Sequence, residues 1–192
     1  PQALEAEARA AQRWYWGAPR RHERGRMDLG AARREIAAIA LTQLGISDPE
    51  AARFLGDAYS ARHEAAAYRF PDAIPALEAL RSGGARLALI TNGTSQGQRG
   101  KIRRFDLEKY FEHILIEQEV GFGKPDLRTY RLALDLLGLD PREVWMVGDN
   151  LVWDVQAAQA AGLFAIWRDP RGAGLPADAC TVPDGIIRDV GE

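Results

Sequence analysis

The stretch Val144-Trp145-Met146-Val147-Gly148-Asp149-Asn150-Leu151-Val152-Trp153-Asp154 decides the fold. Its first four residues form an apolar run typical of a buried strand, and a helix is predicted from Leu151 onward. Asp149 therefore follows a strand, and Asp154 lies in the first turn of a helix. Hard Mg²⁺ takes oxygen ligands from one or two carboxylates and leaves positions for water and substrate phosphate. The alternative is that Asp149 caps the helix and Asp154 is a solvated first-turn acid.

Helices and strands alternate along the chain from residue 70 onward. We expect helices at 72–82, 95–104, 127–137 and 151–161, and strands at 86–90, 113–116, 144–147 and 163–167. Strands joined through single helices form right-handed crossovers and a parallel sheet covered on both faces. The sequence therefore predicts an α/β fold, whose sites lie at the carboxyl ends of the strands.

Residues 1–69 are predicted to contain helices and no strand. A helix at 3–16 is followed by a loop at 17–26 that is rich in Pro, Gly and Arg. Asp28 is a candidate N-cap for a second helix that ends before Gly45. A third helix begins where Asp48 can cap and Pro49 suits the first helical position. The chain thus divides into an all-helical part and an α/β part.

Two further strand ends carry groups that suit a phosphate. Thr91-Asn92-Gly93 supplies a hydroxyl and backbone N–H groups at the start of a helix, where anions bind. Lys124 precedes Pro125 and a helix that Asp126 would cap, and its ammonium suits a phosphoryl group. Taken singly, the first segment also fits an ordinary Asn-Gly turn, and the second fits a surface lysine. All of these groups follow strands, so we expect them to meet at one edge of the sheet.

Bulk composition excludes several classes of protein. The net charge of −2 over 192 residues argues against binding nucleic acid through its phosphates. No apolar run approaches the roughly 20 residues that span a bilayer. Cys180 is the only cysteine, which rules out an internal disulfide and makes a reducing cytoplasm the default compartment. The chain begins at Pro1, which fits either removal of an initiator Met or a protein that starts further upstream.

Taken together and in this order, the three segments resemble the haloacid dehalogenase superfamily of phosphatases and phosphotransferases. That superfamily is recognised by an Asp-x-Asp loop after a first strand, a Thr or Ser after a second strand, a Lys, and an acidic Gly-Asp segment. Here Thr91 matches the second signature, Lys124 in Gly123-Lys124-Pro125-Asp126 the third, and Asp149 with Asp154 the fourth. Each motif falls in the strand-then-helix context that it requires.

The resemblance also implies an organisation for the chain and exposes a departure from the family. Residues 1–69 resemble the family's helical cap, and residues 70–192 resemble most of its Rossmann-like core. The first signature, which carries the nucleophilic Asp and the general-acid Asp, precedes the cap in the family and has no counterpart here. The lost strand is central in the family, between the strands at 86–90 and 144–147. We therefore expect a truncated sequence and a defect in the sheet beside residues 144–147.

The activity that the resemblance implies is magnesium-dependent hydrolysis of a small phosphorylated metabolite through a phosphoaspartyl intermediate. Thr91 and Lys124 would be the catalytic residues, and Mg²⁺ would be the cofactor, held by Asp149 and Asp154. The residues implied to bind phosphate are Thr91, Asn92, Gly93 and Lys124. As given, the chain is expected to be inactive. The alternatives are a metal-free dehalogenase of the same superfamily and a non-catalytic phosphate- or metal-binding fragment. Substrate identity and oligomeric state stay open.

Overall fold

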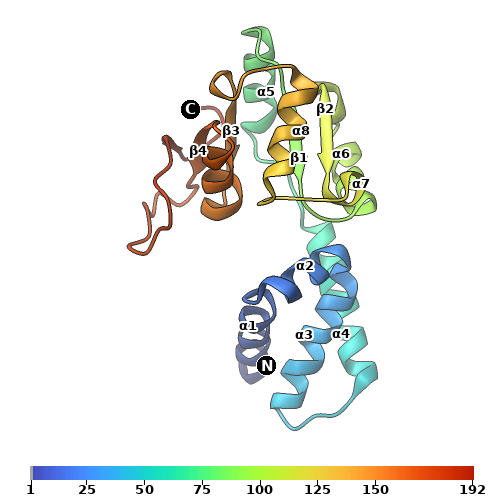
Figure 1. Cartoon of the computed structure of the whole chain (residues 1–192). Coiled ribbons are helices and arrows are strands. Elements are labelled where there is room, and N and C mark those ends of the chain that lie inside the picture. The colour runs from blue at the N-terminus through green and yellow to red at the C-terminus, as the bar shows by residue number, and fades with distance from the viewer. Residues whose placement is uncertain (1) are drawn as a thin grey trace. The chain divides into compact units, whose positions relative to one another are not determined.

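The computed structural model describes residues 2–192 and divides the chain into two compact units, with the boundary between Tyr68 and Arg69 (Figure 1). The first unit is entirely helical in its described part, and the second unit carries all of the described strands. None of the helices among residues 2–192 is both long enough and apolar enough to cross a membrane.

The first unit contains α1 (Gln2–Trp16), α2 (Pro19–Met27), α3 (Leu29–Gln43) and α4 (Pro49–Ala65). Two of these helices begin at the predicted caps. The Asp28 carboxylate accepts a hydrogen bond from Ala31 N at 2.9 Å, and that of Asp48 accepts from Glu50 N and Ala51 N, each at 3.0 Å. Side chains from α1 and α3 form the buried core of this unit, which comprises Ala11, Tyr15, Ala32, Ile36 and Ala40.

The prediction of a loop at residues 17–26 is wrong, because most of these residues form α2. Pro19 occupies the start of the helix, where a missing N–H costs nothing. The Arg21 guanidinium then donates to Tyr15 O at 3.3 Å and to Trp14 O at 2.5 Å, and so satisfies carbonyls at the end of α1. Gly25 is buried directly against the rings of Tyr15 and Trp16. Hydrophobic periodicity missed this helix because a glycine, not an apolar side chain, makes its buried contact.

Gly56 sets the close approach of α4 to α3. A Cβ built on Gly56 would lie 2.7 Å from both Arg34 N and Arg34 Cα, which are backbone atoms of α3. We expect Gly56→Ala to destabilise the first unit by about 1–3 kcal/mol, because the two helices must move apart to admit the methyl group. Urea unfolding followed by circular dichroism measures this. Gly30→Ala in α3, where the nearest atom is Asp28 Oδ1 at 3.5 Å, is the control and should not destabilise. Equal stability of the two variants would contradict the packing argument.

The second unit alternates helices and strands as the sequence predicts, with boundaries shifted by one or two residues. Its strands and longer helical elements are α5 (Ala73–Ser82), β1 (Ala88–Thr91), α6 (Ser95–Arg104), β2 (His113–Ile116), α7 (Glu117–Val120), α8 (Leu127–Leu137), β3 (Trp145–Gly148), a π-helix (Leu151–Gln156), α9 (Ala157–Ala160), β4 (Phe164–Arg168) and β5 (Gly185–Ile187), and short 3₁₀ helices lie at Glu108–Tyr110 and Pro141–Glu143. The sequence did not predict α7, β5 or the π-helix.

The strands form two separate parallel sheets. In one sheet β1 pairs with β2, with Thr91 opposite Ile116; in the other the order is β3-β4-β5, with Gly148 opposite Trp167. Within residues 2–192, β1 and β3 are hydrogen-bonded on one side only. Parallel strands flanked by helices confirm the predicted fold class, and the sheet is interrupted beside β3 as expected.

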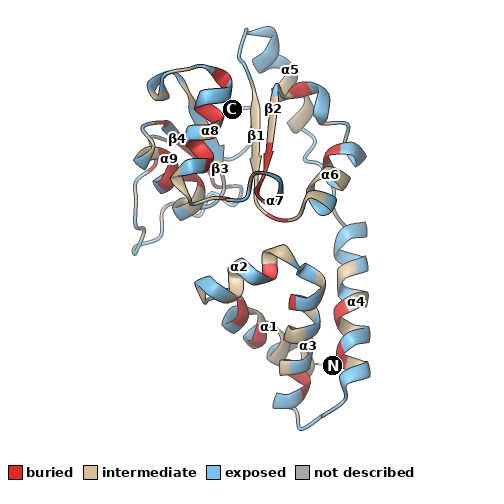
Figure 2. Cartoon of the chain, turned by 45° about the vertical axis from the view of Figure 1, so that its right-hand side comes forward, coloured by how far each residue is buried: buried red, intermediate tan, exposed pale blue. Residues whose placement is uncertain are grey.

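Burial differs between the strands of the β3-β4-β5 sheet, with most of β4 buried and alternate residues of β3 exposed (Figure 2). One face packs on the main hydrophobic cluster, whose fully buried members are Tyr130, Val155, Ala158 and Ala165. The other face presents Trp145, which is 67% exposed and whose ring lies against that of Phe164, with 5.3 Å between the ring centroids and 35° between the planes. The apolar run that begins at Val144 is therefore buried on one side only among the described residues.

Candidate active site

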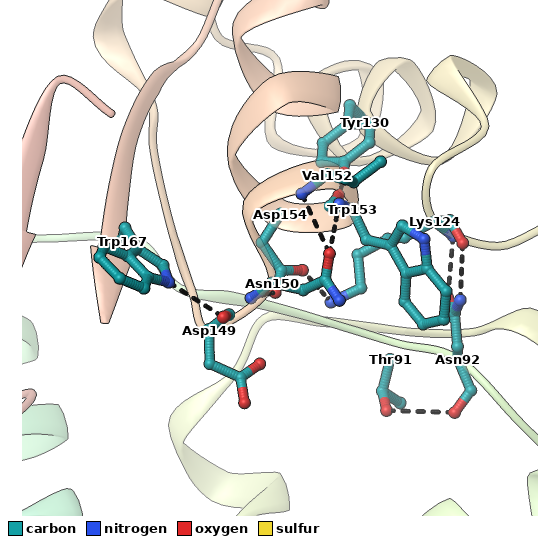
Figure 3. A network of polar contacts seen from close by, with 10 residues as sticks. All are labelled: Thr91, Asn92, Lys124, Tyr130, Asp149, Asn150, Val152, Trp153, Asp154 and Trp167. Atoms are coloured by element: carbon teal, nitrogen blue, oxygen red, sulfur yellow. Dashed lines mark hydrogen bonds and ion pairs between the residues drawn. The ribbon is translucent and has the colours of Figure 1, made fainter. Parts of the chain in front are cut away.

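The predicted site residues lie in the segments that follow β1, β2 and β3, and the shortest hydrogen bond among their side chains joins Lys124 to Asp154 (Figure 3). Lys124 Nζ donates to Asp154 Oδ1 at 2.5 Å. The side chain of Lys124 is 14% exposed and that of Asp154 is 4% exposed. Removing either charge alone would leave the other buried and unpaired, which is strongly destabilising.

Local backbone structure brings Asp154 to this position. Asn150 caps the π-helix, its Oδ1 accepting from Val152 N at 3.0 Å and Trp153 N at 2.8 Å. Asp154 Oδ2 in turn accepts from Asn150 N at 2.9 Å, so both carboxylate oxygens of Asp154 have donors. A Cβ on Gly148 would lie only 2.3 Å from Asp154 Cγ. Glycine is therefore required at the end of β3 for this carboxylate to fold back over the strand.

Tyr130 closes the buried side of the site. Its hydroxyl donates to Trp153 O, and the residue is fully buried. Burial raises the pKa of Tyr130, and the nearby Asp154 carboxylate raises it further. The phenol therefore stays protonated at neutral pH and holds the π-helix against α8.

Asn92 joins the end of β1 to the backbone of Lys124. Its Nδ2 donates to Lys124 O at 2.7 Å, and its Oδ1 accepts from Lys124 N at 2.8 Å. This pair of hydrogen bonds uses both ends of the side-chain amide, so Asn92 fixes the place from which the lysine side chain starts. The Thr91 hydroxyl makes only a long 3.5 Å contact with Asn92 O, which leaves its oxygen and proton available to another group.

Glu117 is a residue of this region that the sequence reasoning missed. It is 5% exposed, and its Oε2 accepts from Gly93 N at 2.9 Å. Gly93 N–H was one of the groups predicted to bind phosphate, and in the structure it already has an anionic acceptor. The position of Glu117 directly after β2 was the available signal, because side chains that follow parallel strands gather at the same edge of a sheet.

Asp149 is exposed and stands apart from the Lys124–Asp154 pair. Its backbone carbonyl accepts from Trp167 Nε1 at 3.0 Å. In Figure 3 its carboxylate points away from Asp154. Among residues 2–192, no side chain forms a hydrogen bond or an ion pair with this carboxylate. Within the same residues, no three His, Cys, Asp or Glu side chains are grouped to hold a metal ion. Asp149 is thus an accessible anion at a strand end.

Glu119 stabilises the loop after β1 from the solvent side, and this gives a prediction for acid stability. Hydrogen bonds from Arg99, and from Ser95 in addition, lower the pKa of Glu119 from 4.5 to about 2. Because the folded-state value is the lower one, the stabilisation is complete above about pH 4.5 and is lost as the pH falls toward 2.

Between pH 5.5 and pH 3.5, wild type should lose about 0.5 kcal/mol more unfolding free energy than Glu119→Gln does. The difference is small because the Glu119 side chain is partly solvated and its charge is screened. Urea unfolding at both pH values measures it. Arg99→Met, which removes the main partner, should flatten the pH dependence in the same way. A wild-type pH dependence in both variants would contradict this assignment.

Comparison with known proteins places this geometry in a family. Residues 3–162 match the model of the haloacid dehalogenase-like hydrolases, and the chain belongs to that family. It is 40% identical over 163 residues to a phosphoserine phosphatase of Thermus thermophilus, an alignment that covers 85% of this chain and 64% of the relative. The chain therefore spans less than two thirds of that protein.

Solved structures agree on the fold. A HAD hydrolase of Bacillus subtilis, crystallised with bound magnesium, aligns with a TM-score of 0.76 at 21% identity and covers 97% of this chain and 79% of that one. A 2-haloacid dehalogenase of Pseudomonas syringae aligns with a TM-score of 0.61 at 28% identity and covers 98% of this chain and 88% of that one. The first likeness is one of fold, and the second includes moderate sequence similarity.

Proposed function

We propose that this chain is the larger part of a magnesium-dependent phosphatase that hydrolyses a small phosphorylated metabolite. The observation that carries the proposal is the buried Lys124–Asp154 pair, beside the accessible Asp149 carboxylate at the end of β3. An ammonium held in place at a strand end suits a phosphoryl group. Similarity to a phosphoserine phosphatase supports the same class of substrate.

Lys124 would neutralise negative charge on the transferring phosphoryl group and on its attacking partner. Asp154 keeps the ammonium in place, with its second oxygen taken by Asn150 N. Asn92 holds the lysine backbone rather than presenting its amide to substrate. We therefore assign direct phosphate contact to the Thr91 hydroxyl and the Lys124 ammonium, and a supporting role to Asn92 and Gly93.

The donor set fits Mg²⁺ through one carboxylate. Asp149 is exposed and free to coordinate, whereas both oxygens of Asp154 already accept hydrogen bonds. Because magnesium commonly binds through one or two carboxylates together with water and substrate phosphate, Asp149 suffices as a protein anchor. Bound there, the ion would supply Lewis-acid stabilisation of charge on the phosphoryl oxygens. Asp154 would act on this site indirectly, by orienting Lys124.

The attacking aspartate that the family resemblance implies is not found in these 192 residues. In the proposed reaction, that carboxylate forms a bond to phosphorus while the bond to the alcohol oxygen breaks, and the leaving oxygen takes a proton from the general-acid Asp that the resemblance implies in the same signature. Water then cleaves the phosphoaspartyl intermediate and releases inorganic phosphate. We propose that residues 1–69 serve as the helical cap of this enzyme and residues 70–192 as its Rossmann-like core without the first strand. We also propose a cytoplasmic location.

A comparison of two proteins tests the proposal. The whole protein, expressed from its complete gene, should hydrolyse phosphoserine or other small phosphate esters only when magnesium is present. The 192-residue chain alone should show no turnover above background, because phosphate monoester hydrolysis is very slow without a nucleophile that divides it into two steps. Robust magnesium-dependent turnover by the 192-residue chain would overturn our assignment of the nucleophile.

The second candidate is a haloacid dehalogenase, which the 28% identity to the Pseudomonas syringae enzyme favours. A dehalogenase of this superfamily needs no metal, whereas an accessible Asp149 at the end of β3 suits one. Release of halide from a short-chain 2-haloacid is the discriminating assay. Halide release that a chelator does not affect, without phosphate release from any ester, would replace the phosphatase proposal by this one.

A further inference from the structure

The short helix α7 fixes the loop between β1 and α6. Both backbone polar groups of Gly93 bind it: Gly93 N donates to Glu117 Oε2 at 2.9 Å, and Gly93 O accepts from Gln118 N at 3.2 Å. Two residues further on, Ser95 N donates to Gln118 Oε1 at 2.8 Å, and Ser95 Oγ donates to Glu119 Oε1 at 2.5 Å. Three consecutive residues of α7 therefore hold the loop that begins at Thr91.

Glu117 differs from its two neighbours because it is buried. Gln118 and Glu119 are exposed, whereas Glu117 is shielded from water and its carboxylate bonds the Gly93 amide. A buried carboxylate is costly unless donors satisfy it, so its presence here needs a compensating role. The hydrogen bond from Gly93 N gives the buried side chain a donor and at the same time holds the backbone amide in place.

Gly123 lets this carboxylate reach the loop. A Cβ on Gly123 would lie 2.6 Å from Glu117 Cδ and 2.7 Å from Asn92 Oδ1. The glycine has no positive φ, so it is required for space and not for backbone conformation. Glu117 and Asn92 thus meet across Gly123, one residue before Lys124. The segments that carry the proposed phosphate-binding groups are locked together at this point.

We infer that Glu117 is a positioning residue of the proposed phosphate site. It holds the Thr91-Asn92-Gly93 turn, and through it the Thr91 hydroxyl, in register with Lys124. The inference rests on the proposed function, since it assumes that this turn binds phosphate. It also changes the assignment of one group: the Gly93 N–H serves Glu117, and the phosphate is bound by Thr91 and Lys124.

The test uses the 192-residue chain with inorganic phosphate as the probe. Backbone amide NMR reports two quantities: hydrogen exchange of the Gly93 amide and the dissociation constant for phosphate, from shifts of residues 91–95. In Glu117→Ala we expect exchange at Gly93 to accelerate at least tenfold and phosphate affinity to fall about tenfold. Glu117→Gln keeps an acceptor oxygen and should stay within about threefold of wild type for both quantities.

Two matched controls separate positioning from general damage. Glu112 precedes β2 at its other end and pairs with Arg86 at 2.7 Å, so Glu112→Gln should leave both quantities unchanged. If Glu117→Ala fails to fold, Gly123→Ala disturbs the same contact and should lower phosphate affinity in the same direction. Gly100→Ala in α6, where a Cβ meets nothing within 4 Å, is its control.

The outcomes distinguish the inference from the function on which it rests. If wild type binds phosphate and both Glu117→Ala and Gly123→Ala bind it equally well, the positioning role is overturned and the phosphate site stands. Absence of phosphate binding in wild type would overturn the proposed site and the inference with it. Loss of affinity in both variants, with recovery in Glu117→Gln and neutral controls, supports the assignment.

Discussion

Replacing Asp149 by asparagine should lower the proposed magnesium-dependent phosphatase rate of the whole protein by about 100-fold or more while leaving the fold intact. The substitution is isosteric and removes one negative charge from an exposed position, so packing is preserved. Magnesium dehydrates reluctantly and depends on carboxylate charge, so its occupancy should fall. A Lewis acid contributes several kcal/mol to the stability of the transition state, and about 2.7 kcal/mol corresponds to a factor of 100.

Initial rates measured against magnesium concentration for both proteins provide the test, with circular dichroism as the check on folding. Part of the lost rate should return at high magnesium, because weaker binding is compensated by concentration. Asp178→Asn, at an exposed position in the segment before β5, is the control and should leave the rate unchanged. Equal rates for Asp149→Asn and wild type, or a rate that a chelator does not alter, would defeat the metal assignment.

The second large effect concerns the stability of the chain itself. Asp154→Ala should lower the unfolding free energy by about 3 kcal/mol, because it leaves the Lys124 ammonium without its partner in a site that is nearly closed to water. It also deprives Asn150 N of its acceptor. Denaturant unfolding of the 192-residue chain measures this directly and requires no activity.

Two further variants identify the cause. Lys124→Met combined with Asp154→Ala should be more stable than Asp154→Ala alone, since the unpaired charge is then removed. Glu112→Ala breaks the exposed pair with Arg86 and should cost much less unfolding free energy than Asp154→Ala. If Asp154→Ala costs as little as Glu112→Ala, the pair is not buried in solution as described.

The sequence predicts those parts of the fold that depend on neighbours along the chain. Asp28, Asp48 and Asp126 all cap the helices expected of them, because an N-cap is decided within three residues. Each strand and helix from residue 70 onward is likewise predicted from nearby residues, and their alternation predicts the α/β fold class. By contrast, α2 depends on contacts with α1, and the spacing of apolar residues along the sequence does not reveal such contacts.

The same distinction between local features and distant contacts applies to the candidate site. Thr91, Lys124 and Asp149 were candidate site residues because each follows a predicted strand, and the family resemblance supplied their proposed roles. The partners of these groups could not be predicted, because they come from elsewhere in the chain: Lys124 meets Asp154 across 30 residues, and Gly93 meets Glu117 across 24. No pattern in a single sequence gives such pairs, and they decide which polar groups remain available to a ligand.

The π-helix at Leu151–Gln156 bears on how this segment tolerates changes in length. A π-turn amounts to one residue more than an α-helix needs for the same path. Deleting a single residue between Asn150 and Asp154 would let the segment relax into an α-helix. The residues that follow the deletion, Asp154 among them, would keep their path, because the lost residue is the extra one of the π-turn. A one-residue deletion before Asp154 should therefore be tolerated better than substitution of Asp154 itself, because it removes the extra residue of a turn and not the partner of Lys124.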